Sequence, residues 1–411
     1  MAKGERGASS LDGLIVLDFT RVLSGPFCTM QLADLGARVI KVEQPGRGDD
    51  TRAWGPPFVD GESAYFLSIN RNKESLTLDL KHPSARSIVD ALLVRADVLV
   101  ENFRPGTMER LGFDYGRVAA KHPHLIYCSI SGFGDEGPRR REAGYDAVLQ
   151  AEGGFMSVTG PGEGSPYRLG LAIADLATAL FATQGVLAAL IARERTGRGQ
   201  RVDIAMLDSV AALLTYQAGI YFATGAAPMR MGNRHPSIAP YDTYRAFDGD
   251  LVLAVGNDDQ FQRLCGVLNR PDLASDPLFT TNAGRVEHYP SLKAALDASI
   301  GARTLDDLTS ALRAAGVPGG SVRTVAETLA DPQIAARDML ESVVTYTDTD
   351  LPNGQKTRIR SITLSPGVRG GWNLKGEKQI VIGAAVPITW TTNTTITGVF
   401  GYFSYELPFT K

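Results

Sequence analysis

Cysteine and histidine are scarce in this chain, whose 411 residues include 3 cysteines and 5 histidines. The cysteines, Cys28, Cys128 and Cys265, are widely separated and match neither a zinc-binding nor a Cys-x-x-Cys pattern. We therefore expect them to be reduced and buried, as is usual inside cells. The one close histidine pair, His122 and His124, has no cysteine or carboxylate at ligand spacing, so we expect surface histidines and no metal site.

An excess of one charge is also missing. The chain has 42 Lys and Arg against 45 Asp and Glu, a net charge of -3, which gives no indication of a nucleic-acid or membrane surface. Its first residues, Met1–Leu11, lack the apolar core of a signal peptide, and no run reaches the roughly 18 apolar residues that span a bilayer. We expect a cytoplasmic protein of two or three domains, at roughly 100–200 residues per domain.

Three widespread motifs are absent as well. Gly-x-Gly-x-x-Gly does not follow the first expected strand, which argues against a nicotinamide dehydrogenase. The glycine-rich stretch 160–164 lacks the Lys-Ser or Lys-Thr ending of a Walker A loop, and the Gly-x-Ser-x-Gly elbow of a serine hydrolase does not occur. Glycine itself is abundant, with 44 residues, which indicates many tight turns and loops where backbone comes close to a ligand.

Short apolar runs alternate with helical patterns through the first half of the chain. Residues 14–18, 38–43, 97–101, 125–130 and 201–206 have the pattern of strands, and residues 25–35, 83–95 and 174–195 have that of helices. This alternation predicts βαβ units with right-handed crossovers. We therefore predict an α/β fold, with an open, mostly parallel Rossmann-like sheet in a large domain of residues 1–225.

The second half of the chain predicts a smaller α+β domain over residues 226–335. The stretch Pro236–Pro240 and the glycines before it indicate a boundary, and a strand at 251–255 is followed by helical segments at 259–268, 291–298 and 305–315. Residues 336–411 differ, because they are rich in threonine and β-branched residues. We expect this C-terminal segment to return to the large domain and to have an atypical, β-rich end.

Polar loops follow the strands of the large domain. In open parallel sheets, ligands bind beyond the carboxyl ends of the strands. The loops after the first four strands are rich in glycine and carry arginines, whose guanidinium groups pair with phosphate through two hydrogen bonds. The arginines that we expect to face phosphates at this edge are Arg21, Arg47, Arg52, Arg104 and Arg110.

Several short stretches are weak signals alone but specific in their order and spacing. They are Leu11–Gly13, Leu17–Thr20, Leu35–Glu43, Asn70–Lys73, Leu78–Lys81, Val100–Gly106, Ser131–Gly134, Gly144–Asp146, Ile173–Leu176 and Thr196–Gln200. With them, the chain resembles the class III CoA-transferases over about residues 11–340. This is the CaiB/BaiF family, which includes formyl-CoA transferases and succinyl-CoA:carboxylate CoA-transferases.

The resemblance implies that Asp175, at the start of the helix 174–195, is the nucleophile. In that family a carboxylate attacks the acyl-CoA thioester and forms a mixed anhydride, and the released CoA thiolate then gives an aspartyl-CoA thioester. An acceptor carboxylate takes the CoA in turn. No metal or general base is needed, because an aspartate with an ordinary pKa of about 3.9 is already ionised. A dry site is needed, since water hydrolyses the anhydride. Taken alone, a carboxylate at this position is also typical of a helix cap.

The resemblance also implies contacts with CoA. The first-strand loop should line the site, Leu78–Lys81 should hold adenosine and phosphate, and Asn102–Arg104 should run along pyrophosphate and pantetheine. Gln44 stands where the family often carries a basic residue near the adenine. The full set of implied contacts is Val22, Leu23, Ser24, Gln44, Leu78, Asp79, Leu80, Lys81, Asn102, Phe103, Arg104, Arg110, Tyr145 and Asp146.

Two other functions are compatible with parts of this pattern. The same fold hosts α-methylacyl-CoA racemases, which use a histidine at the position of Tyr145, where a phenol with a pKa near 10 is a poor substitute. A non-catalytic CoA-binding homologue would have no use for Asp175. We expect no permanently bound cofactor and an interlocked homodimer. The expected substrates are an acyl-CoA, succinyl-CoA first, and a small carboxylic acid, a dicarboxylate first.

Overall fold

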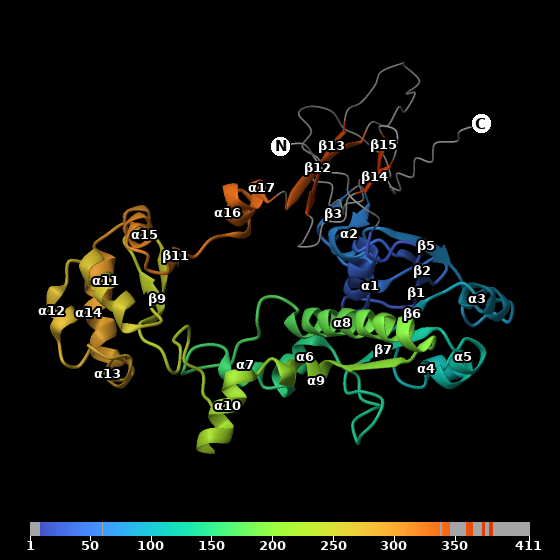
Figure 1. Cartoon of the computed structure of the whole chain (residues 1–411), viewed down its shortest axis with the longest axis horizontal. Coiled ribbons are helices and arrows are strands. Elements are labelled where there is room, and N and C mark those ends of the chain that lie inside the picture. The colour runs from blue at the N-terminus through green and yellow to red at the C-terminus, as the bar shows by residue number, and fades with distance from the viewer. Residues whose placement is uncertain are drawn as a thin grey trace. The chain divides into compact units, whose positions relative to one another are not determined.

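The computed structural model describes residues 9–59, 61–337, 339–345, 359–364, 372–374 and 378–380 (Figure 1). These residues belong to two compact units. The first comprises the described parts of Met1–Gly153, Gly170–Leu214 and Pro332–Lys411, and the second comprises Gly154–Leu169 and Thr215–Asp331. Most of the threonine-rich end expected at the C-terminus lies outside the described residues.

A six-stranded sheet forms the centre of the first unit, with the strand order β5-β2-β1-β6-β7-β8. All neighbouring strands are parallel, which confirms the predicted parallel sheet. The chain builds β1, β2 and β5 outward in one direction and then returns to place β6 on the other side of β1. The strands are β1 (Ile15–Asp18), β2 (Arg38–Glu43), β5 (Lys73–Thr77), β6 (Val98–Glu101), β7 (Ile126–Ser131) and β8 (Arg201–Ala205).

Helices cover both faces of this sheet because successive residues of each strand point to opposite sides. Val98 and Val100 pack in the core beneath α1 (Ser24–Asp34) and α8 (Ile173–Thr196). Leu99, between them, packs on the other face with α3 (Ala85–Leu93), α4 (Thr107–Leu111) and α5 (Tyr115–Lys121). The predicted helices 25–35, 83–95 and 174–195 are thereby confirmed.

Helix α8 is, within the described residues, the one helix long and apolar enough to cross a membrane. Half of its apolar stretch is buried inside the protein, and the helix packs against α1, β7 and β8. Its side chains Ala179, Ala182, Val186 and Ala189 belong to the core of the sheet. The apolar composition of α8 therefore serves the packing of the first unit.

Shorter elements complete the first unit. A hairpin and a one-turn helix follow β2, and α6 precedes α8. The remaining elements are η1 (Asp50–Ala53), β3 (Phe58–Val59), β4 (Glu62–Ser63), α2 (Ala64–Ile69), α6 (Asp146–Glu152), α9 (Met206–Ala212), α17 (Pro332–Ala336), β12 (Leu340–Thr345), β13 (Ile359–Leu364), β14 (Trp372–Leu374) and β15 (Lys378–Ile380). Strand β12 pairs with β13, and β14 with β15, both antiparallel.

The second unit packs helices around a three-stranded antiparallel sheet with the order β11-β10-β9. Its own apolar core includes Leu251, Phe261, Leu292 and Leu308. The predicted strand near 251–255 and the three predicted helices after it are present. The elements are α7 (Phe155–Val158), α10 (Thr215–Thr224), β9 (Tyr241–Arg245), β10 (Asp250–Ala254), α11 (Asp258–Val267), α12 (Pro271–Ser275), α13 (Asn282–Glu287), α14 (Tyr289–Gly301), α15 (Leu305–Ala314), β11 (Gly319–Ser321) and α16 (Val325–Leu329).

The predicted positions of the cysteines are confirmed, whereas that of one histidine is not. All three cysteines are free and buried, as predicted. The prediction of a surface position is wrong for His122, which is only 8% exposed. It follows directly after α5 and lines a small pocket together with Leu93 and Val118. Among the residues described, no cluster of three or more His, Cys, Asp or Glu side chains is arranged to hold a metal ion.

Two glycines bring the loop after β7 against the start of α6. A Cβ added at Gly132 would lie 2.7 Å from the Cα of Gly144, and backbone cannot move aside as a flexible side chain can. We predict that Gly132→Ala lowers the free energy of unfolding by about 1–3 kcal/mol, as overpacking does. Gly266→Ala is the matched control, because that glycine lies in α11 with no atom within 4 Å of the added Cβ.

Urea unfolding of the two variants measures this difference. The control should be neutral or stabilised by up to about 1 kcal/mol, since alanine is the better helix former. Equal midpoints for Gly132→Ala and Gly266→Ala would contradict the close approach.

Candidate active site

The carboxyl ends of β1 and β6 lie at the point where the strand order reverses, and the loops after them diverge there. Asn102 joins the two loops: its Oδ1 accepts the Arg21 N–H and its Nδ2 donates to the Arg21 carbonyl, both at 2.8 Å. The Arg21 guanidinium lies over the ring of Phe103, 5.4 Å from its centre. Glu101 accepts the Phe103 N–H at 2.9 Å. The structure thus brings Asn102 and Phe103 together with the loop that carries Val22–Ser24.

Asp175 lies in the first turn of α8, partly buried. Ser24, the first residue of α1, is itself buried and lies close to it. Burial, followed by the nearby charge of Asp146, raises the pKa of Asp175 to about 7, although hydrogen bonds from the Ser24 hydroxyl and backbone N–H lower it. Burial, which the sequence does not show, therefore acts against the ionised carboxylate that the ordinary pKa of an aspartate leads us to expect.

Asp146 caps α8 from another helix. The N-cap residue Ala172 has no side-chain hydrogen-bonding group, so the first N–H groups of α8 need a partner from elsewhere. Asp146, in the first turn of α6, accepts the Ala174 N–H through Oδ1 at 2.9 Å and the Gln150 side-chain amide through Oδ2 at 2.8 Å. Tyr145, just before it, is 61% exposed. Of the two carboxylates, Asp146 is thus held by the backbone of α8 and by Gln150, whereas Asp175 interacts with the hydroxyl and N–H of Ser24.

Tyr65 is a neighbour of the site that the sequence analysis missed. Burial comes first among the causes that raise the pKa of Tyr65 to about 12, and the charges of Asp175, Asp146 and Asp49 follow. Its ring packs edge-on against Trp54, with centroids 5.2 Å apart. Tyr65 lies on α2, which follows a short hairpin, so a search of parallel-strand ends could not find it.

Other implied CoA contacts lie along the same carboxyl edge. Residues Leu78–Lys81 follow β5, and the Leu78 N–H donates to the carbonyl of Glu43 at the end of β2. Gln44 is exposed in the turn after β2, and its carbonyl accepts the Gly48 N–H. Arg104 and Arg110 are exposed on the loop and helix after β6.

The arginines near the β2 loop are paired with carboxylates. Arg52 lies 2.8 Å from Glu43 and stacks over the ring of Phe66, with 3.8 Å to the ring centre. Arg52 also lies 3.2 Å from Glu62, so its charge is paired within the fold, and its contact with a phosphate stays a prediction. Arg47 pairs with Asp50 at 2.7 Å in an exposed position.

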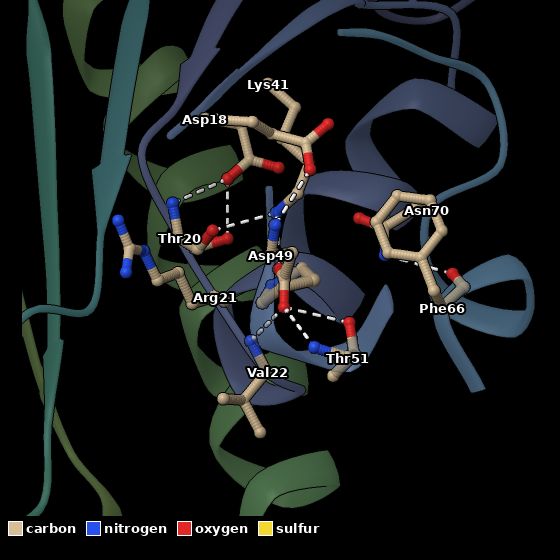
Figure 2. Close-up of polar contacts among 12 residues, drawn as sticks. Asp18, Thr20, Arg21, Val22, Lys41, Asp49, Thr51, Phe66 and Asn70 are labelled. Carbon is tan, nitrogen blue, oxygen red and sulfur yellow. Dashed lines mark hydrogen bonds and ion pairs between the residues drawn. The ribbon is translucent and has the colours of Figure 1, made fainter. Parts of the chain in front are cut away.

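Four charged side chains lie buried beneath the loop after β1, and Figure 2 labels three of them, Asp18, Lys41 and Asp49. Asp18 pairs with Lys73 at 3.0 Å, and Lys41 with Asp49 at 2.9 Å. Burial opposes ionisation of Asp18, but the charges of both lysines outweigh it and hold the pKa of Asp18 well below its usual range. Burial lowers the pKa of Lys73 to about 8, against the opposing charge of Asp18.

Known proteins resemble this chain over most of its length. Residues 11–361 match the family described as CoA-transferase family III. The acetyl-CoA:oxalate CoA-transferase of Acetobacter aceti is 47% identical over 330 residues, which cover 80% of this chain and 85% of that protein. The succinate–glutarate CoA-transferase of Agrobacterium fabrum is 42% identical over 359 residues, 86% of this chain and 90% of that protein.

Solved structures agree with these sequence matches. A CaiB/BaiF family protein from Brucella suis has a TM-score of 0.77 and 41% identity, covering 92% of this chain and 96% of that one. The protein Rv3272 from Mycobacterium tuberculosis has a TM-score of 0.73 and 34% identity, covering 82% and 90%. This chain belongs to CoA-transferase family III, the CaiB/BaiF family of CoA-transferases.

Proposed function

We propose that the enzyme moves CoA from succinyl-CoA or acetyl-CoA to a dicarboxylic acid, with Asp175 as the nucleophile. The observation that carries this proposal is the partly buried carboxylate of Asp175, in the first turn of α8 and beside the hydrogen-bond donors of Ser24. The named substrates of the relatives support the choice of donor and acceptor, because oxalate and glutarate are both dicarboxylates.

The reaction balances without water. One oxygen of Asp175 attacks the thioester carbonyl, the C–S bond breaks, and CoA thiolate leaves as the mixed anhydride forms. The thiolate attacks the Asp175 carbonyl carbon, which releases the donor acid and leaves an aspartyl-CoA thioester. The acceptor carboxylate then attacks that thioester and expels the thiolate. Attack of the thiolate on the acceptor's acyl carbon gives the new acyl-CoA and restores Asp175.

The surroundings of Asp175 suit these steps. A raised pKa makes the ionised carboxylate a more basic and hence stronger nucleophile, provided that the pH is high enough to ionise it. Ser24 supplies two donors, a hydroxyl and a backbone N–H, where negative charge moves between the carboxylate and the thioester oxygen. The neutral phenol of Tyr65 helps to keep the carboxylate away from water.

CoA itself occupies the carboxyl edge of the sheet in this proposal. Val22, Leu23, Asn102 and Phe103 flank the reversal of strand order and line the pantetheine arm. The outer part of the site holds the nucleotide end through Gln44, Leu78, Asp79, Leu80, Lys81, Arg104 and Arg110, with Tyr145 and Asp146 near the thioester. No cofactor stays bound, and the working form is an interlocked homodimer in the cytoplasm.

Replacing the nucleophile tests the proposal directly. We predict that Asp175→Asn abolishes CoA transfer from succinyl-CoA and acetyl-CoA to oxalate and glutarate, followed by mass spectrometry. Asp208→Asn is the matched control, because Asp208 also lies in the first turn of a neighbouring helix, α9. It should retain full activity.

Hydroxylamine added during turnover should convert Asp175 of the wild type into a hydroxamate that a peptide map locates. Transfer that survives in Asp175→Asn would refute the mechanism. Proton exchange at the α-carbon of a 2-methylacyl-CoA without CoA transfer would instead identify a racemase.

The pH dependence follows from the raised pKa of Asp175. Protonated Asp175 cannot attack, so kcat/KM for the acyl-CoA should decrease as the pH falls through about 7, rather than through about pH 4–5. This decrease is the acid limb of the pH profile. Asp146→Asn removes the neighbouring negative charge and keeps an oxygen for the Ala174 N–H, so the limb should move to lower pH. Glu152→Gln, at the other end of α6, should leave the limb in place. An Asp146→Asn profile that overlays the wild type would contradict this electrostatic account.

The free energy of unfolding should also depend on the ionisation of Asp175, and it should decrease as the pH rises. The folded protein holds the Asp175 proton more tightly than the unfolded chain, so ionisation between about pH 4 and pH 7 destabilises the fold. We predict that Asp175→Asn raises the free energy of unfolding at pH 8 by at most about 4 kcal/mol and has little effect at pH 4. Thermal melts at the two pH values check this, and equal gains at both would exclude a role for the charge.

A further inference from the structure

Val22 has a backbone conformation that β-branched residues rarely adopt. Its φ is 69°, in the left-handed region, where the Cβ meets neighbouring backbone. The strain lies two residues before Ser24, at the entrance to α1. Such a conformation persists only where surrounding groups hold it.

Asp49 holds Val22 from the side of β2. Its Oδ1 accepts the Val22 N–H at 3.3 Å and is itself fixed by the Thr51 N–H at 3.0 Å and the Thr51 hydroxyl at 2.8 Å (Figure 2). Lys41 lies 2.9 Å from the other oxygen of Asp49, as an ion pair, and donates to the Thr20 carbonyl at 2.8 Å. Lys41 and Asp49 are each 2% exposed, so neither charge has an alternative partner in water.

The same short loop is fixed at its other points. Asn102 holds the backbone of Arg21 from the side of β6. Asp18 accepts both the N–H and the hydroxyl of Thr20, at 2.8 and 2.5 Å. A Cβ at Gly25 would lie 2.9 Å from the Thr20 Oγ1, so the start of α1 is packed directly on this loop. The backbone on the N-terminal side of Val22 is thus held by these contacts, and we expect a change in the backbone of Val22 to be passed on through Leu23 to Ser24.

We propose that the buried Lys41–Asp49 pair is a positioning device for the nucleophile: Asp49 keeps Val22 in its left-handed conformation, and this aims the hydroxyl and N–H of Ser24 at Asp175. The proposal rests on the proposed role of Asp175. Asp146 and Tyr65 also interact electrostatically with Asp175, and neither lies on the loop after β1. Loss of the Val22 hydrogen bond therefore acts on Asp175 through Ser24.

Two double variants separate the hydrogen bond from the ion pair. Lys41→Met with Asp49→Ala removes both charges and the oxygen that holds Val22, and leaves no unpaired buried charge. Lys41→Met with Asp49→Asn removes the same charges but keeps that oxygen. Arg71→Met with Asp34→Ala is the matched control, because it removes another buried pair, whose Arg71 Nε lies 2.9 Å from the Asp34 Oδ1.

The readout is single-turnover reaction with succinyl-CoA or acetyl-CoA, with hydroxylamine trapping at Asp175, across the pH range. The alanine variant should trap about tenfold to a hundredfold more slowly, and its acid limb should move up by about one pH unit, because Ser24 no longer favours the ionised carboxylate. The asparagine variant and the control should keep the wild-type limb. Adding Val22→Gly to the alanine variant should restore the limb, since glycine adopts this φ without strain.

Each outcome decides the matter. The positioning role would be overturned if the acid limbs of the alanine and asparagine variants lay at the same pH. It would also be overturned if the alanine variant with Val22→Gly folded but kept the shifted limb. If the alanine variant does not fold, Thr51→Val takes its place: it loses one donor that fixes Asp49 and should shift the limb in the same direction by a smaller amount, and no shift would refute the proposal. Absence of hydroxamate in the wild type would instead refute Asp175 as the nucleophile.

Discussion

Four buried charges around the end of β1 are the constraint on which this site depends: Asp18 ends β1, Lys41 lies within β2, Asp49 lies in the loop after β2, and Lys73 begins β5. Asp18, Lys41, Asp49 and Lys73 are all between 0 and 5% exposed. Removing such groups from water costs several kcal/mol per ion, and their attraction offsets that cost only when the geometry is good and the remaining polar atoms are bonded. Here the partners include backbone groups, such as the Thr20 and Pro26 carbonyls and the Val22 N–H, and the hydroxyls of Thr20, Thr29 and Thr51. The charges therefore specify the path of one loop more than they add stability.

That loop matters because of where it runs. It leaves β1 beside the reversal of strand order, and it ends at the first residue of α1. Asn102 holds it from the loop after β6 and Asp49 from the loop after β2, so the loops after two other strands converge on it. An open sheet offers a crevice at such a point in general terms. The ionic and amide contacts hold the backbone of this loop just before Ser24, which is the basis of its proposed positioning.

The sequence predicted the sheet well where strands are apolar and poorly where they are not. Residues 14–18 and 97–101 are buried on both faces and have no competing pattern. Strand β5, with the sequence Lys73-Glu74-Ser75-Leu76-Thr77, lies at the sheet edge and was missed, because its alternation is mostly polar. Lys73 is nevertheless buried, since its ammonium group reaches inward to Asp18.

The sequence likewise predicts some residues of the candidate site and not others. Residues next to strand ends, such as Val22–Ser24 and Asn102, follow from the topology, and the family resemblance pointed to Asp175. Tyr65 and the carboxylate partner of Arg52 depend on how α2 and the β2 loop fold back, which no strand pattern records. The raised pKa of Asp175 was likewise out of reach, because it comes from burial and from Asp146, 29 residues earlier in the chain.

Helix α8 contributes both to the core of the sheet and to the candidate site. Its apolar composition resembles that of a membrane span, half of this apolar stretch is buried, and its core-facing side chains pack against the sheet, with its first turn partly buried. A carboxylate there resists ionisation, while the start of a helix and the donors of Ser24 favour it. Because the raising effects prevail and the pKa of Asp175 lies at about 7, small displacements of Ser24 or Asp146 change its ionised fraction at neutral pH. The reactivity of the proposed nucleophile is thus set by the packing of the helix that carries it.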